Sequence, residues 1–127
     1  MSTFTSTFDR FKDLPEKVVR GSLISMTNRI IERSPVDTGR FRGNWQFTTG
    51  KPASRQLSNT DKRGGKRQSA LQKKILAVEI GKVYYITNNL PYGQKLEFGS
   101  SSQAPQGMVR VTLAEFDAFL KKKAGEL

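Results

Sequence analysis

The sequence predicts an α+β fold in which a long N-terminal helix and C-terminal helices pack on a small, mostly antiparallel β-sheet, with a long basic loop. Apolar residues recur at helical spacing near both ends of the chain, and a segment of alternating apolar and polar residues lies between them. A polar, basic stretch without a hydrophobic pattern interrupts the middle. A length of 127 residues suits one domain, so we expect residues 1–127 to form a single unit.

Two helices are expected before Pro35, which ends the second one. Phe4, Phe8 and Phe11 share one helical face and indicate a short helix in an N-terminal arm, residues 1–14. The stripe of the second helix is formed by Val19, Leu23, Met26 and Ile30, widened by Ile24 and Ile31. We expect both stripes to belong to the core, with the Phe face of the arm the better candidate for a contact between subunits.

The segment SPVDTGRFRGNW is expected to turn the chain and enter a strand. Asp37 suits an Asx-type turn, and Gly39 suits a positive φ. The sequence near Asp37 contains no base and no second carboxylate, so a turn is favoured over a catalytic role for Asp37. Residues 40–48 alternate with period two, which predicts a half-buried strand. Its core-facing residues are Phe41, Gly43, Trp45 and Phe47, and Gly43 allows close approach of another backbone.

Residues 49–68 form a predicted flexible, basic insertion loop. Eight basic residues and one acid, Asp61, lie between Lys51 and Lys74. Most of this stretch has too few apolar residues to offset its ordering entropy, so we expect it to be mobile alone. The loop is suited to contact DNA phosphates or an acidic neighbouring subunit. The alternative is a solvated insertion that aids solubility. The candidate contact residues are Lys51, Arg55, Lys62, Arg63, Lys66 and Arg67.

The C-terminal half is expected to contain three helices and one strand. A capping pattern at Ser69 and a glycine at Gly81 predict a helix between them, although a hairpin turning at Gly81 and Lys82 is the alternative. The strand is expected at 82–87, a short helix at 90–98, an extended connection at 100–106 and a last helix from Gly107. The buried stripe of the last helix is formed by Val109, Leu113, Phe116 and Leu120.

The composition excludes several classes of chemistry. Cysteine and histidine are absent, which removes disulfides, thiol chemistry, and the commonest general base and metal ligand. No phosphate-binding glycine motif is present, and Tyr92, Lys95 and Glu97 do not share one helical face. We therefore expect no enzymatic activity, catalytic residue, metal or cofactor. No apolar run approaches the roughly 20 residues of a membrane span, so we expect no membrane partner.

Three segments resemble a known family. RSPVDTGRFRGNW, YYITNNLPYGQKLEFGSSSQAPQGMV and RVTLAEF are similar to the small tail-component proteins of long-tailed bacteriophages, the neck or tail-completion proteins. The resemblance covers about Val18 to Phe119 without the basic loop. It implies a structural protein of the virion tail or neck, made in the host cytoplasm. It also implies a ring, of six copies, that joins the tail tube and tail terminator to the head-closure proteins and leaves a lumen for DNA.

The predicted subunit interface combines the aromatic face of the arm with the segment around the short helix. Its candidate residues are Phe4, Phe8, Phe11, Pro91, Tyr92, Leu96, Phe98, Gln103, Ala104, Pro105 and Met108. Two alternatives stay open. One is the tail terminator protein of the same junction. The other is a stand-alone basic nucleic-acid-binding protein, which an isoelectric point near 10.3 favours.

Overall fold

The computed structural model describes residues 15–99, 102–104 and 107–126 of the chain. The predicted helix with Phe4, Phe8 and Phe11 lies outside these residues, as does Pro105. The elements in chain order are α2 (Glu16–Arg33), η1 (Arg42–Asn44), β1 (Gln46–Thr49), α3 (Gly65–Ala77), β2 (Tyr84–Thr87), α4 (Gly93–Glu97) and α5 (Val109–Glu126).

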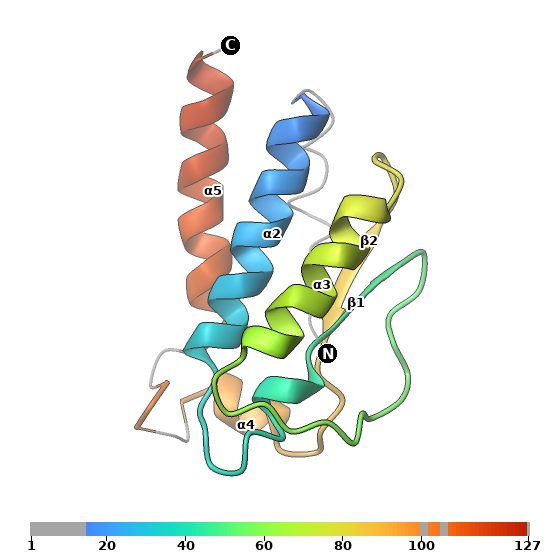
Figure 1. Cartoon of the computed structure of the whole chain (residues 1–127). Helices are drawn as coiled ribbons and strands as arrows, with labels where there is room; N and C mark the ends of the chain where they lie inside the picture. The colour runs from blue at the N-terminus through green and yellow to red at the C-terminus, as the bar shows by residue number, and fades with distance from the viewer. Residues whose placement is uncertain (1–14, 100–101, 105–106, 127) are drawn as a thin grey trace.

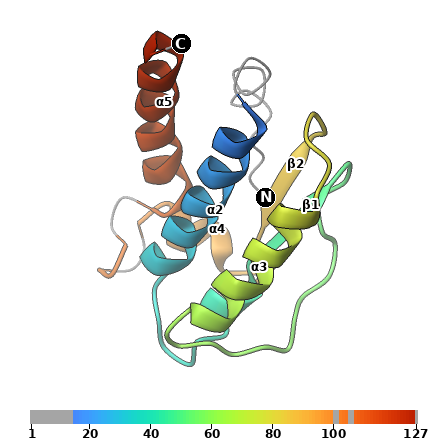
Figure 2. The ribbon, with the colours of Figure 1, turned by 45° about the horizontal axis from the view of Figure 1, so that its top comes forward.

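The three long helices lie side by side, with α2 between α5 and α3 (Figures 1 and 2). Helices α2 and α5 run in opposite directions, and the short α4 lies at the end of the molecule where α2 ends and α5 begins (Figure 1). Strands β1 and β2 pair antiparallel beside α3, with Phe47 opposite Ile86. This arrangement confirms the predicted α+β class, and the sheet has two strands within the described part of the chain.

Helix α2 supplies one face of the core, as its spacing predicts. Val19, Leu23, Met26 and Ile30 are each at most 1% exposed, so the four-and-three repeat does face inward. The surfaces packed against them come from η1, the sheet, α3 and the start of α5. Their main buried side chains are Phe41, Trp45, Phe47, Leu71, Ile75, Tyr84, Ile86, Met108, Val109 and Phe116.

Residues 40–48 do not form the single predicted strand. The 3₁₀ turn η1 replaces its first half, and only the second half is extended. Phe41 and Trp45 are one helical turn apart, so a turn buries both just as alternation would, and their rings meet edge to face at 5.7 Å. Asn44, which a period-two strand would place on the face opposite Phe41 and Trp45, is fully buried. Gly43 does allow the close approach, because a Cβ there would lie 3.1 Å from the Asn59 carbonyl oxygen.

Helix α3 begins four residues before the predicted start at Ser69. Asp61 explains the difference, because its carboxylate accepts the N–H of Gly64 at 3.1 Å and that of Arg67 at 2.8 Å. These contacts satisfy backbone donors that a helix leaves free at its start. The predicted insertion loop at 49–68 therefore ends earlier, since residues 65–68 are helical. The mobility of the loop stays a prediction.

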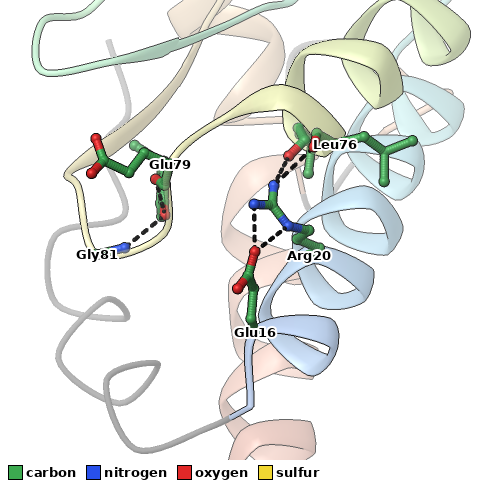
Figure 3. Close-up of polar contacts among 7 residues, drawn as sticks. Glu16, Arg20, Leu76, Glu79 and Gly81 are labelled. Carbon is green, nitrogen blue, oxygen red and sulfur yellow. Dashed lines mark hydrogen bonds and ion pairs between the residues drawn. The ribbon is translucent and has the colours of Figure 1, made fainter.

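The end of α3 is bound to the start of α2. Arg20 Nη1 donates to the carbonyl oxygens of Ile75 and Leu76 at 2.6 and 3.2 Å, and the same guanidinium donates to Glu16 (Figure 3). A cation is favourable beside the free carbonyls of a helix C-terminus. Helix α3 ends at Ala77 and not at the predicted Gly81, since Val78 is already extended.

Gly81 has another role, in the turn between α3 and β2. Its φ is 96°, and its N–H donates to the Tyr84 hydroxyl, which itself donates to the Glu79 carbonyl (Figure 3). The prediction of a helix followed by a strand is confirmed, and the hairpin alternative is wrong.

The remaining elements lie within their predicted ranges. Strand β2 and helix α4 are each shorter than expected, and α5 begins two residues after Gly107. Gly107 itself has a φ of 83°, a left-handed conformation that a right-handed helix cannot include. Phe116 is buried and Leu113 half-buried, as predicted for the stripe of α5. The side chain of Leu120 lies outside the described residues.

A polar clamp joins α2 to α5 near the C-terminal end of α2. Glu115 pairs with Arg29 at 3.0 Å and also with Arg33, and Arg33 Nη1 donates to Thr112 Oγ1 at 2.8 Å. The hydrogen bond from Arg33 lowers the pKa of Glu115 against the opposing effect of burial, and the charges of both arginines add to the lowering.

We expect Glu115→Gln to lower the free energy of unfolding by about 1 kcal/mol at neutral pH, because exposed ion pairs contribute roughly 0.2–1 kcal/mol each. A lowered folded-state pKa makes this contribution complete above the ordinary value of 4.5 and lost as the pH falls through the folded-state pKa. Urea unfolding at a series of pH values should therefore show the two proteins converging in acid. If the difference in free energy of unfolding between the two proteins is the same at every pH, Glu115 does not stabilise the fold through its charge. Glu79→Gln, which removes an exposed carboxylate 3.6 Å from Lys82, is the control.

Candidate interaction surfaces

Two segments that are far apart in the sequence meet at the end of the molecule that contains α4 (Figure 1). The backbone of Val36 is paired in both directions, since its N–H donates to Gln103 Oε1 at 2.9 Å and its carbonyl accepts from Gln103 Nε2 at 3.1 Å. The rings of Phe41 and Tyr92 lie 5.9 Å apart. A hollow of about 260 Å³ lies between the two segments. We call this surface, formed by residues 34–41, 88–99 and 102–104, the connector end.

The two asparagines that precede α4 hold the connector end to the rest of the chain. Asn88 is fully buried and its Nδ2 donates to the Phe41 carbonyl at 2.8 Å. Asn89 Nδ2 donates to the carbonyls of Ala53 and Arg55 at 2.8 and 3.0 Å, and thereby fastens the basic loop. Buried amides need such partners, so these bonds set the path of the backbone on both sides.

Glu97 organises the start of α5. It is 7% exposed, and its carboxylate accepts the backbone N–H groups of Met108, Val109 and Arg110 at 3.1, 2.9 and 2.9 Å. Arg110 Nε also donates to it at 3.2 Å. An anion at a helix N-terminus satisfies free donors and opposes the positive end of the helix dipole. Glu97 therefore acts as a cap supplied from eleven to thirteen residues upstream.

The sequence alone did not identify this cap. Glu97 is too far from α5 for a capping motif, which is recognised by a spacing of three residues. The only signal in the sequence is Gly107, because a glycine is needed where another backbone approaches closely. A Cβ at Gly107 would clash with the Glu97 carbonyl oxygen.

Arg110 also contacts the exposed ring of Phe98 beside this cap. Its Nη2 donates to the Glu97 carbonyl at 2.6 Å, and its guanidinium lies 4.7 Å from the centre of the Phe98 ring. Phe98 is 70% exposed, although a ring of this size usually loses most of its contact with water in a folded protein. The connector end thus displays an aromatic side chain whose position is set by a buried polar network.

The backbone of the basic loop is fastened at several points along its length. Leu57 N–H donates to Asn44 Oδ1 at 2.7 Å, and Gln46 Nε2 donates to the Arg55 carbonyl at 2.7 Å. Further along, Asp61 N–H donates to the Gly39 carbonyl at 2.9 Å. The loop is therefore joined to η1, β1 and the turn after α2.

The basic side chains of the loop point outward. Lys51, Arg55, Lys62, Arg63 and Lys66 are exposed, and none of them forms an ion pair with an acid in the described part of the chain. Arg67 differs because it is half-buried, and burial lowers its pKa against the opposing charge of Asp61. The loop and the start of α3 thus form a surface of unpaired cations.

The predicted interface residues divide into two groups. Pro91, Tyr92, Phe98 and Gln103 are exposed at the connector end. Leu96 is half-buried, while Ala104 and Met108 are 5% and 1% exposed and pack in the core of the single chain. The subunit contact predicted for Ala104 and Met108 stays a prediction, since their burial is that of the single chain.

The acid and base side chains noted near α4 do not converge. The Glu97 carboxylate faces the amides of α5, the Tyr92 ring faces Phe41, and Lys95 is exposed. Within the described ranges, no group of three or more acidic residues is arranged to hold a metal ion. In the same ranges, no helix is both long and apolar enough to cross a membrane. No protein-family model, curated protein or solved structure matches this chain.

Proposed function

We propose that this chain is a structural protein of a bacteriophage head–tail junction, of the tail-completion type, that assembles with copies of itself into a ring. One observation carries the proposal. The segments SPVDTGRF and NNLPYGQKLEFG, on which the family resemblance rests, come together with Gln103 as the connector end. Residues that are scattered in the sequence therefore form one surface.

The composition of the connector end suits contact with another protein. Tyr92 and Phe98 are 41% and 70% exposed, and Arg110 and Arg40 lie beside them on the surface. Aromatic residues and arginine are the side chains enriched in protein interfaces. The hydrogen bonds of Asn88, Gln103 and Glu97 hold the backbone of this surface before any partner binds, which reduces the entropy lost on association.

A ring needs two different surfaces on each subunit that fit one another. In the proposed ring, the connector end of one copy contacts a different surface of its neighbour. One rim meets the tail tube and its terminator, and the other meets the head-closure protein. DNA passes through the lumen. In this ring the connector end binds a neighbouring copy, a role that requires no catalytic side chain.

The experiment compares two exposed apolar residues at opposite ends of the molecule. Phe98→Ser alters the connector end, whereas Leu76→Ser alters the C-terminal end of α3, where Leu76 is 54% exposed (Figure 3). We expect both variants to have the same melting temperature as the wild type. In phage production, the Phe98 variant should leave separate heads and tails and reduce infectious particles at least tenfold, and the Leu76 variant should not. Electron microscopy of virions with a label on this chain should place it in the neck. A label absent from particles, or equal effects of the two variants, would exclude the proposal.

The surface of unpaired cations favours a second candidate, a stand-alone nucleic-acid-binding protein. Neutralising Lys51, Arg55, Lys62, Arg63 and Lys66 with glutamine tests it. Deletion of the loop is less suitable because it would also remove Asp61, which caps α3. Tight binding of duplex DNA by the isolated monomer would favour this candidate. The slope of log K against log salt concentration should then become shallower by about 0.9 for each phosphate-contacting cation that is replaced.

A further inference from the structure

An apolar groove of about 350 Å³ runs between α2 and α5. One wall is formed on α2 by Val18, Gly21, Ser22 and Ser25, and the other on α5 by Phe116 and Phe119. The clamp of Glu115 with Arg29 closes one end. Lys17, in the first turn of α2, lines the opposite end.

Small residues on α2 create this groove. Gly21 has no side chain, and a Cβ built there would meet nothing within 4 Å. Ser22 and Ser25 are short, so two turns of α2 leave space where leucine-sized side chains would normally fill a contact between helices. Ser22 is 3% exposed, and its Oγ has no hydrogen-bond partner among the described residues. The groove is therefore large, apolar and lined by a helix face that α5 covers only in part.

The chain itself offers an apolar segment beside the Lys17 end of the groove. Fourteen residues precede Pro15, which adjoins the first turn of α2. They include Phe4, Phe8 and Phe11, whose spacing places three aromatic rings on one face of a helix. The core-facing stripe of α2 offers these rings no place, because Val19, Leu23, Met26 and Ile30 are already at most 1% exposed.

The segment is short enough to fit within the groove. As a helix, residues 4–11 would span about 10 Å, whereas residues 17–29 of α2, which include the lining residues of this helix, span about 18 Å. Four residues, 12–15, join the two, and four extended residues reach about 13 Å, which exceeds the separation of roughly 8–10 Å between packed helices. The short connection also gives the segment a high effective concentration at the groove of its own chain.

We propose that the groove between α2 and α5 is a docking site for residues 4–11 of the same chain, with Phe4, Phe8 and Phe11 against Gly21, Ser25 and Phe116. In this proposal the segment runs antiparallel to α2. Docking of this segment, and not of a partner protein, then covers the apolar face that α2 and α5 leave open.

The absence of native cysteine makes a cross-linking test specific. Phe8→Cys combined with Ser25→Cys places one thiol on the segment and one in the groove. Phe8→Cys combined with Ala77→Cys is the control, because Ala77 is exposed at the end of α3 and Arg20 holds that end close to the start of α2. Under mild oxidation of dilute protein, we expect the groove pair to form an intramolecular disulfide at least tenfold faster than the control pair.

Three results would overturn the proposal: equal rates for the two pairs, no disulfide in the groove pair, or disulfides mainly between two chains. The last result would assign the groove to the arm of a neighbouring copy. A second measurement avoids dependence on disulfide geometry. In the Phe4→Ser, Phe8→Ser, Phe11→Ser variant, amide hydrogen exchange in residues 18–25 should accelerate at least tenfold, while exchange in residues 71–75 of α3 stays unchanged. Equal exchange in the variant and the wild type would also overturn it.

Discussion

Glu97→Gln is expected to destabilise the protein by about 2–4 kcal/mol, because each buried backbone donor left without a partner costs roughly 1–3 kcal/mol. The carboxylate accepts three backbone N–H groups and the Arg110 side chain within a site that is only 7% exposed. Glutamine keeps one acceptor oxygen, but its amide group would face backbone donors and leave them without partners. Urea unfolding monitored by the fluorescence of Trp45 measures the change.

The control is Glu16→Gln, which makes the same chemical change where Glu16 pairs with Arg20 and is 63% exposed. This variant should lose no more than about 1 kcal/mol, because exposed ion pairs contribute little. Amide signals at the start of α5 should also shift or broaden in the Glu97 variant and not in the control. Equal losses for the two variants would mean that Glu97 does not cap α5.

Gly39→Ala is expected to cost about 2–5 kcal/mol. Gly39 has a φ of 88°, and a left-handed conformation costs a residue with a Cβ roughly 1–2 kcal/mol. A Cβ at this position would also lie 2.5 Å from the Lys62 nitrogen and 2.8 Å from the Asp61 carbonyl carbon. Both are backbone atoms, so the loop must move away, at a further cost of roughly 1–3 kcal/mol.

Gly50→Ala separates the two contributions. Gly50 has a φ of 80°, but a Cβ there would meet nothing within 4 Å, so only the conformational cost applies. Thermal unfolding should give a drop for Gly39→Ala that is at least twice that of Gly50→Ala. Similar drops would show that the turn after α2 and the basic loop are not in close contact. Because Asp61 caps α3, the Gly39 variant should also weaken the first turn of that helix.

The motifs on which the resemblance rests overlap with the residues of the connector end, but motif and surface are defined on different grounds. The resemblance depends on the order of short motifs, and it gives no distances. In the structure, the asparagines and Gln103 form side-chain bonds to backbone atoms of the turn after α2 or of the basic loop. A polar motif in a loop can therefore serve the backbone of another segment instead of a ligand, and sequence patterns do not distinguish these two roles.

The sequence by itself determined the elements that the spacing of neighbouring apolar residues predicts. The stripe of α2 predicted its buried face correctly, and the strand at β2 and the helices α4 and α5 were placed within a few residues. These predictions succeed because helical and strand periodicity is a property of neighbouring residues. Gly39 was likewise correctly assigned to a turn with a positive φ, since its φ is 88°.

Only the tertiary structure decided the features that depend on residues far apart in the chain. Period two across residues 40–48 suited a strand, but burial of Phe41 and Trp45 against α2 is satisfied equally well by a turn, and η1 forms there. The starts of α3 and α5 depend on Asp61 and Glu97, carboxylates that lie outside the helices they cap. A backbone donor is satisfied by whichever acceptor the fold brings within about 3 Å, and sequence distance does not enter that condition.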